Sequence, residues 1–191
     1  MYKAVIFDFF GVFDLDLYDH WLKENGYSRT GKFAEIVKGM DDGTTANETF
    51  FHTLGTLSGQ DPAIVKQQMY GYSVLNDEMV SIVKILRQNH YSSVLLSNAN
   101  TAFIYTVLNK HGIAPLFDEI IISSEIGFAK PSKEIFDYTL QKLKADHNEV
   151  IFIDDRRENI QAAERLGIKS LVFTNAEKLK HELECLGITL S

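Results

Sequence analysis

Two short apolar runs in this sequence each end in aspartate, and they constrain the fold more than any other feature. Val5–Phe7 leads into Asp8, and Val150–Ile153 leads into Asp154 and Asp155. Short runs rich in β-branched and aromatic residues are typical of strands buried in a parallel sheet. If the two strands are neighbours, all three carboxylates lie at the carboxyl edge of the sheet, where open α/β sheets bind their ligands.

From residue 90 onward, strand-like and helix-like segments alternate along the chain. The expected strands are 93–97, 119–123, 150–153 and 170–173, and the expected helices are 101–111, 132–144, 158–166 and 176–186. This alternation is typical of a parallel sheet that is covered by helices on both faces. The sequence therefore predicts an α/β fold with a doubly wound parallel sheet.

Residues 14–76 carry a different pattern, which is helical throughout. Helix-like stretches lie at about 17–25, 31–40, 46–58 and 61–73, with apolar residues at helical spacing, and there is no clear strand. A helix at 77–89 then returns the chain to the sheet. We expect a core domain of residues 1–13 and 77–191, and a small helical cap domain of residues 14–76 inserted after the first strand.

Composition limits the classes of partner. The 191 residues include 26 acidic and 19 basic side chains, and the net charge of −7 disfavours sequence-independent binding of nucleic acid. No apolar run approaches the length of a membrane span, and the first strand begins without a basic and apolar leader. We therefore expect a cytoplasmic protein with neither a nucleic-acid nor a membrane partner.

Four short motifs stand at strand ends or helix starts. In chain order they are Asp8, Ser97-Asn98, Lys130-Pro131 and Asp154-Asp155. Together, on this α/β pattern, they resemble the haloacid dehalogenase-like (HAD) hydrolase superfamily with a small helical cap. The stretches 95–100, 127–131 and 152–155, followed by Asn159 and Gly167, look most like its sugar-phosphate phosphatase branch. The resemblance implies a Rossmann-like fold and a Mg²⁺-dependent phosphatase for a small phosphorylated metabolite, present as a monomer or weak homodimer.

The metal and the nucleophile follow from carboxylate chemistry. Asp8 is a candidate nucleophile, since a carboxylate can attack phosphorus and form an aspartyl-phosphate. Asp8, Asp154, Asp155 and the backbone carbonyl of Phe10 are candidate Mg²⁺ ligands, because clustered acids repel one another without a cation. The ion would neutralise the charge that develops on phosphate.

Two further motifs are candidates for phosphate binding. The Ser97 hydroxyl and the backbone N–H of Asn98 can donate to phosphoryl oxygens, although Ser97 could instead cap the following helix. Lys130 can pair with both the phosphate and Asp8, and its alternative is a surface lysine. Among the remaining charged residues, we expect Asp16 to belong to a solvated turn and to the acids at a helix N-terminus, and Arg156 to be solvated.

Phe10 departs from the family pattern. The resemblance implies a second aspartate two residues after the nucleophile, which protonates the leaving oxygen and later activates water, and phenylalanine can do neither. The substrate could have a good leaving group, such as an acyl or anomeric phosphate, or Asp14 or Asp16 could replace the acid. A site that binds phosphate ligands without turnover is a second class of function. A metal-free 2-haloacid dehalogenase is a third, although paired Asp154-Asp155 favours Mg²⁺ and phosphate.

Overall fold

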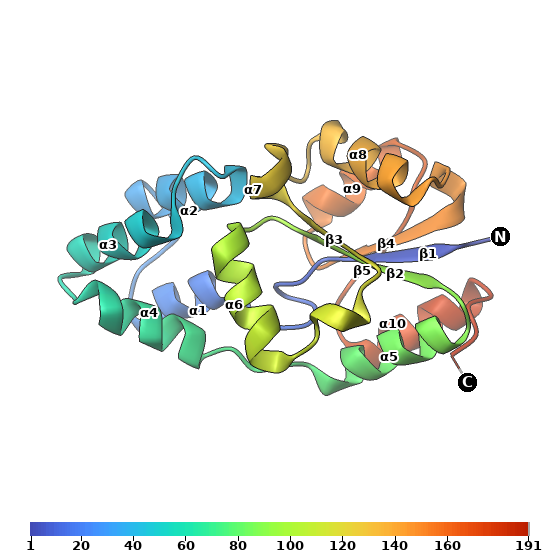
Figure 1. The fold of residues 1–191 in the computed structure, drawn as a ribbon, viewed down its shortest axis with the longest axis horizontal. Coiled ribbons are helices and arrows are strands. Elements are labelled where there is room, and N and C mark those ends of the chain that lie inside the picture. The colour runs from blue at the N-terminus through green and yellow to red at the C-terminus, as the bar shows by residue number, and fades with distance from the viewer. Residues whose placement is uncertain (191) are drawn as a thin grey trace.

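A five-stranded parallel sheet forms the centre of the computed structural model, which describes residues 1–190. The strand order is β3-β2-β1-β4-β5, so β1 is central. The strands are β1 (Ala4–Phe7), β2 (Ser92–Ser97), β3 (Glu119–Ile122), β4 (Val150–Asp154) and β5 (Lys169–Val172). The chain adds strands on one side of β1 and then crosses to the other, which confirms the predicted doubly wound sheet (Figure 1).

Helices cover both faces of this sheet. One face packs against α5 (Asp77–Gln88), α6 (Thr101–His111) and α10 (Ala176–Cys185), and the other packs against α8 (Lys133–Leu143) and α9 (Arg157–Arg165). Alternate residues of β1 pack on opposite faces of the sheet, because successive side chains of a strand point in opposite directions. Val5 and Phe7 belong to the first core cluster, and Ala4 and Ile6 belong to the second.

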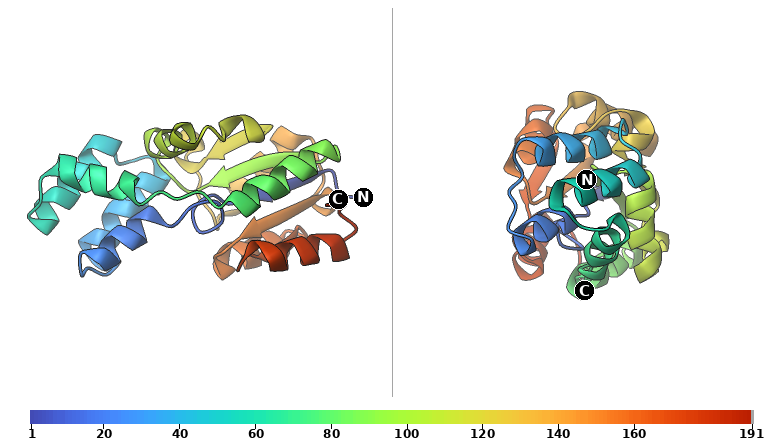
Figure 2. Two further views of the ribbon diagram at one scale, coloured as in Figure 1. Left: turned by 90° about the horizontal axis from the view of Figure 1, so that it is seen from below. Right: turned by 90° about the vertical axis from the view of Figure 1, so that its left-hand side faces the viewer.

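Residues 14–76, here called the helical insert, lie beyond the carboxyl ends of the strands (Figures 1 and 2). The insert contains α1 (Leu17–Glu24), α2 (Lys32–Asp42), α3 (Asn47–Ser58) and α4 (Pro62–Gly71). Trp21, Phe50 and Phe51 are buried, as expected for core residues of a helical bundle. The Trp21 indole N–H also donates to the Gln68 side chain at 3.0 Å, which ties α1 to α4.

Two segments connect the insert to the sheet, and Asp14 joins them. Its carboxylate accepts hydrogen bonds from the Ser73 hydroxyl and, at 3.0 Å, from the Val74 backbone N–H. The Ser73 hydroxyl is also 2.7 Å from the His111 ring. Asp14 is thus a buried structural residue that holds the two connecting segments together.

The sequence patterns do not reveal three short elements. These are α7 (Ser123–Ile126) and two 3₁₀ helices, Ala114–Leu116 and His147–Glu149. Ser123, the last residue of a predicted strand, instead begins α7. No helix among residues 1–190 is long and apolar enough to cross a lipid bilayer.

Candidate active site

The register of β1 and β4 brings the predicted carboxylates together. Phe7 pairs with Ile153, and the Asp8 backbone N–H donates to the Ile153 carbonyl at 2.8 Å. Asp8 and Asp154 therefore lie side by side at the carboxyl edge of the sheet. One oxygen from each of Asp8, Asp154 and Asp155 lies within 4.8 Å of the others. A compact set of carboxylate oxygens suits a hard cation such as Mg²⁺.

Lys130 lies between two of these acids. Its ammonium nitrogen is 2.9 Å from Asp8 Oδ1 and 2.7 Å from Asp154 Oδ2, and its side chain is almost fully buried. Burial alone would lower the pKa of Lys130, but the two carboxylates outweigh this effect and raise it. Burial also raises the pKa of Asp8, and Lys130 opposes that rise. The surface alternative for Lys130 is wrong, because its charge is buried against the candidate nucleophile.

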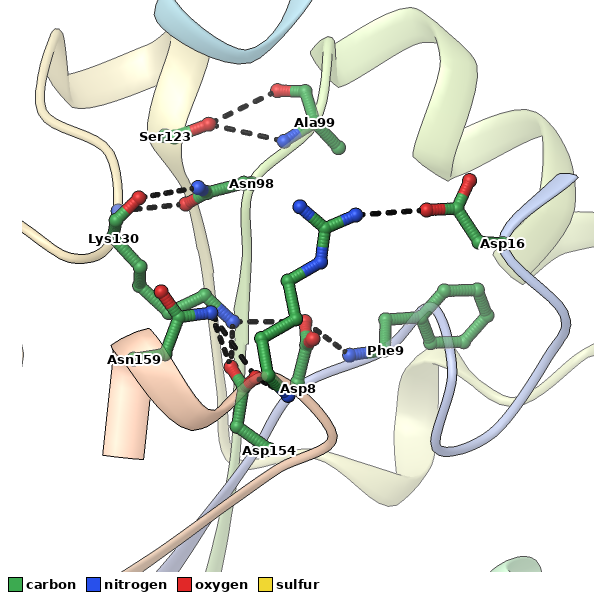
Figure 3. A network of polar contacts seen from close by, with 10 residues as sticks. Asp8, Phe9, Asp16, Asn98, Ala99, Ser123, Lys130, Asp154 and Asn159 are labelled. Atoms are coloured by element: carbon green, nitrogen blue, oxygen red, sulfur yellow. Dashed lines mark hydrogen bonds and ion pairs between the residues drawn. The ribbon is translucent and has the colours of Figure 1, made fainter. Parts of the chain in front are cut away.

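Asn98 holds the backbone of Lys130 in place. The Asn98 side-chain amide donates to the Lys130 carbonyl at 2.8 Å and accepts from the Lys130 backbone N–H at 2.8 Å (Figure 3). The end of β2 thereby clamps the loop that carries the lysine. The sequence suggests only a backbone N–H donor at Asn98, because side-chain contacts across 32 residues leave no local pattern.

The two acids that follow β4 have different surroundings. Asp154 is fully buried and accepts hydrogen bonds from the Asn159 amide at 2.9 Å and from the Arg156 backbone N–H at 2.8 Å. Asp155 is exposed and packs against Gly11. A Cβ at Gly11 would lie 2.4 Å from Asp155 Oδ2, and the φ of +87° also favours glycine. Gly11 therefore gives Asp155 room beside the loop that follows Asp8.

Ser97, at the end of β2, carries a buried hydroxyl with no hydrogen-bond partner among residues 1–190. The N-cap of α6 is instead Asn100, whose side chain accepts from the backbone N–H groups of Ala102 and Phe103. The capping alternative for Ser97 is therefore wrong. Since an unpaired buried hydroxyl costs free energy, a bound oxyanion is a reasonable partner for it.

A cavity extends from these groups to the helical insert. The sheet edge and its loops contribute Asp8, Phe10, Asn98, Ala99, Phe103, Lys130, Arg156 and Asn159. The insert contributes Asp16, Leu17, Tyr18, Arg29, Val37, Met40, Asp41 and Phe50. The Phe10 ring takes part in an aromatic wall, with centroid distances of 5.8 Å from Phe10 to Phe103 and 6.3 Å from Phe103 to Phe50. The position of the missing acid is thus part of an apolar surface.

Arg156 and Asp16 join the two parts of the cavity wall. Their ion pair is 2.9 Å long, and Arg29 pairs with the same carboxylate at 3.3 Å and with Asp19 at 3.1 Å. The Arg156 side chain stays 40% exposed, so it is partly solvated, and the insert also places an acid beside it. Asp16 caps α1, as expected for an acid at a helix N-terminus, and it also accepts hydrogen bonds from two guanidinium groups.

Asp14 and Asp16 are the two acids expected to be able to replace the aspartate missing at position 10. Asp14 holds the connecting segments, and Asp16 is paired with two arginines. Both carboxylates are therefore committed to structural contacts in this arrangement.

The sequence profile of the haloacid dehalogenase-like hydrolases matches residues 2–167. The chain belongs to this family. The match covers β1, the helical insert and both carboxylate motifs, so the resemblance seen in the four motifs is confirmed.

Two relatives within the family are phosphatases by name. D-ribitol-5-phosphate phosphatase of Bacteroides thetaiotaomicron is 27% identical over 205 aligned positions, which cover 96% of this chain and 97% of the relative. Sesquiterpene phosphatase astK of Aspergillus oryzae is 26% identical and is matched over 75% of this chain and 74% of its own length. The match to D-ribitol-5-phosphate phosphatase therefore extends over nearly the whole of both chains.

A solved structure shows the same fold. The magnesium complex of the HAD family enzyme bt-2542 from Bacteroides thetaiotaomicron superimposes with a TM-score of 0.78 at 22% identity. The alignment covers 95% of this chain and 98% of that structure. The parallel sheet and the helical insert thus recur together in another member of the family.

Proposed function

We propose that this protein is a Mg²⁺-dependent phosphatase that acts on a small phosphorylated metabolite through an aspartyl-phosphate at Asp8. The observation that carries the proposal is the convergence of Asp8, Lys130, Asp154 and Asp155 at the sheet edge, where Asp8 and Lys130 also line the cavity. The phosphatase names of two relatives and the magnesium complex of a structural neighbour support it.

The residues suggest how the reaction would proceed. An Asp8 carboxylate oxygen attacks phosphorus while the bond from phosphorus to the leaving oxygen breaks, and water later hydrolyses the aspartyl-phosphate. The Lys130 ammonium balances charge at Asp8 and Asp154, while the Ser97 hydroxyl and the Asn98 backbone N–H donate to phosphoryl oxygens. Mg²⁺ would be held by Asp8, the Phe10 carbonyl, Asp154 and Asp155, and would neutralise developing charge on the phosphoryl group.

In this proposal the helical insert of residues 14–76 is a cap domain on a core of residues 1–13 and 77–191. Eight of the residues that line the cavity come from this insert, and they face the sheet edge that carries Asp8. The cap would exclude water from the aspartyl-phosphate and select the substrate.

The proposal predicts phosphate release that depends on Mg²⁺. The assay uses acetyl phosphate, glucose 1-phosphate, 4-nitrophenyl phosphate and ribitol 5-phosphate, each with Mg²⁺ and with a chelator. We expect release from at least one substrate only when Mg²⁺ is present. Tight binding of phosphate without release would favour the non-catalytic alternative. Chloride release from 2-chloropropionate in the presence of the chelator would favour the dehalogenase.

A second prediction concerns the metal. Asp154→Ala should weaken Mg²⁺ binding by at least about tenfold, because ligands and their supporting groups commonly contribute that much to affinity. Titration calorimetry measures this directly, and Asp154→Asn tests the loss of charge at nearly constant shape. Asp137→Asn on α8, which removes a surface carboxylate paired with Lys133, is the control. An unchanged affinity in both Asp154 variants would rule out this ligand set.

A further inference from the structure

Asp41 lines the cavity, and its carboxyl group makes no ion pair or hydrogen bond with residues 1–190 that would give it a structural role. The cavity lining includes three carboxylates, those of Asp8, Asp16 and Asp41. Asp8 is the candidate nucleophile, and Asp16 is paired with Arg29 and Arg156. Asp41 is half-buried, and residues 1–190 offer its carboxyl group no hydrogen bond. Its role is therefore open.

Asp41 lies where the helical insert touches the core. It belongs to the last turn of α2, and its backbone carbonyl accepts a hydrogen bond from the Ser123 hydroxyl at the start of α7. Two residues later, Gly43 packs so closely on Ser124 that a Cβ would lie 2.8 Å from the Ser124 carbonyl oxygen. These contacts fix the end of α2 on the core and hold Asp41 over the cavity that contains Asp8.

The charged groups around Asp41 come from several elements. Arg29, Arg156 and Lys130 favour its charged form, Asp16 opposes it, and Lys38 and Asp42 are nearby on its own helix. Burial is the strongest influence and raises the pKa of Asp41 to about 7. A carboxyl group with this pKa can be protonated or ionised near neutral pH, as a general acid–base group must be.

The other titratable groups on the cavity wall are poorly suited to act as the general acid–base group. The Tyr18 hydroxyl donates to the Phe33 carbonyl at 2.6 Å, and burial raises its pKa further. Lys130 is held by two carboxylates that raise its pKa. The described lining includes no histidine.

We propose that Asp41 is the acid–base residue that replaces the aspartate missing at Phe10. This inference rests on the proposed phosphatase function. As Asp8 attacks phosphorus and the bond to the leaving oxygen breaks, the Asp41 carboxyl gives its proton to that oxygen. The resulting Asp41 carboxylate then takes a proton from the water that attacks the aspartyl-phosphate, and the phosphorus–oxygen bond to Asp8 breaks. The reaction releases phosphate and returns both aspartates to their starting states.

This assignment links acid catalysis to the position of the insert. Asp41 comes from α2, whereas Asp8 and Lys130 come from the sheet edge and its loops. The acid–base residue thus joins the nucleophile only when the insert lies on the core. A substrate that holds the two parts together would complete the catalytic set.

The test compares substrates that need different amounts of acid help. Ribitol 5-phosphate and glycerol 3-phosphate lose poor alkoxide leaving groups, whereas 4-nitrophenyl phosphate loses a phenolate that departs readily. For Asp41→Asn we expect kcat/KM on the alkyl phosphates to fall by about 10²-fold or more, and on the aryl phosphate by less than about tenfold. Phe10→Asp in the Asp41→Asn background should restore much of the loss on alkyl phosphates.

The pH dependence supplies an independent measure. In the wild-type protein, kcat/KM on alkyl phosphates should fall as pH rises through about 7, because only protonated Asp41 can donate. In Asp41→Asn this fall in kcat/KM should be absent. Ionisation of the substrate phosphate, with a second pKa of about 6, affects both proteins alike. The pH profile of the wild-type protein can be measured even if Asp41→Asn does not fold, and a profile without this fall would contradict the role of Asp41.

Glu35→Gln, which removes an exposed acid from the same helix, is the control and should leave both activities unchanged. Equal losses on alkyl and aryl phosphates in Asp41→Asn, or no loss, would overturn the assignment. So would wild-type activity on 4-nitrophenyl phosphate alone, since that result would mean that no acid is supplied. A protein that releases phosphate from none of the substrates would instead overturn the proposed phosphatase function.

Discussion

Asp8→Asn should lower phosphatase turnover by about 10⁴-fold or more, the largest effect expected of any single substitution in the site. Removal of a covalent nucleophile commonly costs this much, because the remaining groups can only bind and polarise the substrate. The amide has nearly the shape of the carboxylate, and Lys130 keeps Asp154 as a partner at 2.7 Å. The fold should therefore survive.

Two measurements check this expectation. Phosphate release gives the turnover, and intact-protein mass spectrometry after rapid acid quenching detects the aspartyl-phosphate, which the wild-type protein should form and Asp8→Asn should lack. Asp137→Asn on α8 is the matched control for loss of a carboxylate. Turnover within tenfold of wild type would show that the phosphoryl group does not pass through Asp8.

Lys130→Met should destabilise the Mg²⁺-free protein by about 3–5 kcal/mol at pH 7, because the loss of one buried partner leaves the others uncompensated. Asp8 and Asp154 would then face each other inside the protein with no cation between them. The pKa of Lys130 is raised above its usual 10.5, so the stability from the lysine is fully present at pH 7. That stability would be lost only as pH rises through the raised pKa.

Denaturant unfolding without Mg²⁺ measures this change. The deficit of Lys130→Met should shrink as pH falls toward 5, since the unpaired carboxyl groups can then take up protons. Lys133→Met is the control, because Lys133 pairs with Asp137 on the surface of α8 and such pairs contribute at most about 0.5 kcal/mol. Equal stability of the two methionine variants would contradict a charge-balancing role for Lys130.

Much of this architecture is predictable from the sequence, because its signals are local. Val5–Phe7 and Val150–Ile153 are short apolar runs typical of buried strands, and each delivers its aspartate to the same edge because parallel strands share one direction. The insert is also predictable, since helical spacing of apolar residues needs no knowledge of distant partners. The strand pattern thus places Asp8, Asp154 and Asp155 at one edge of the sheet, and the pairing of β1 with β4 in the structure makes them neighbours.

Other parts of the site depend on contacts between residues far apart in the chain. Asp16 and Arg156 are separated by 140 positions, and neither residue belongs to a pattern that identifies the other. Asn98 clamps Lys130 through side-chain geometry that a strand pattern does not encode. The ion pair of the partly exposed Arg156 could not be predicted for the same reason, because the partner of such a charge is decided by which element packs beside it.

Asp41 is the clearest example of a residue whose surroundings depend on contacts that the sequence pattern does not reveal. In the sequence it is one of two adjacent acids at the end of an amphipathic helix, a setting that usually means exposure to solvent. Local patterns in the sequence predict the sheet, the insert and the place of Asp8 at a strand end, because apolar periodicity and strand direction need no knowledge of distant residues. The packing of α2 on the core, which brings Asp41 into the cavity with Asp8, depends on contacts between distant residues, and so do the burial and the charged neighbours of Asp41.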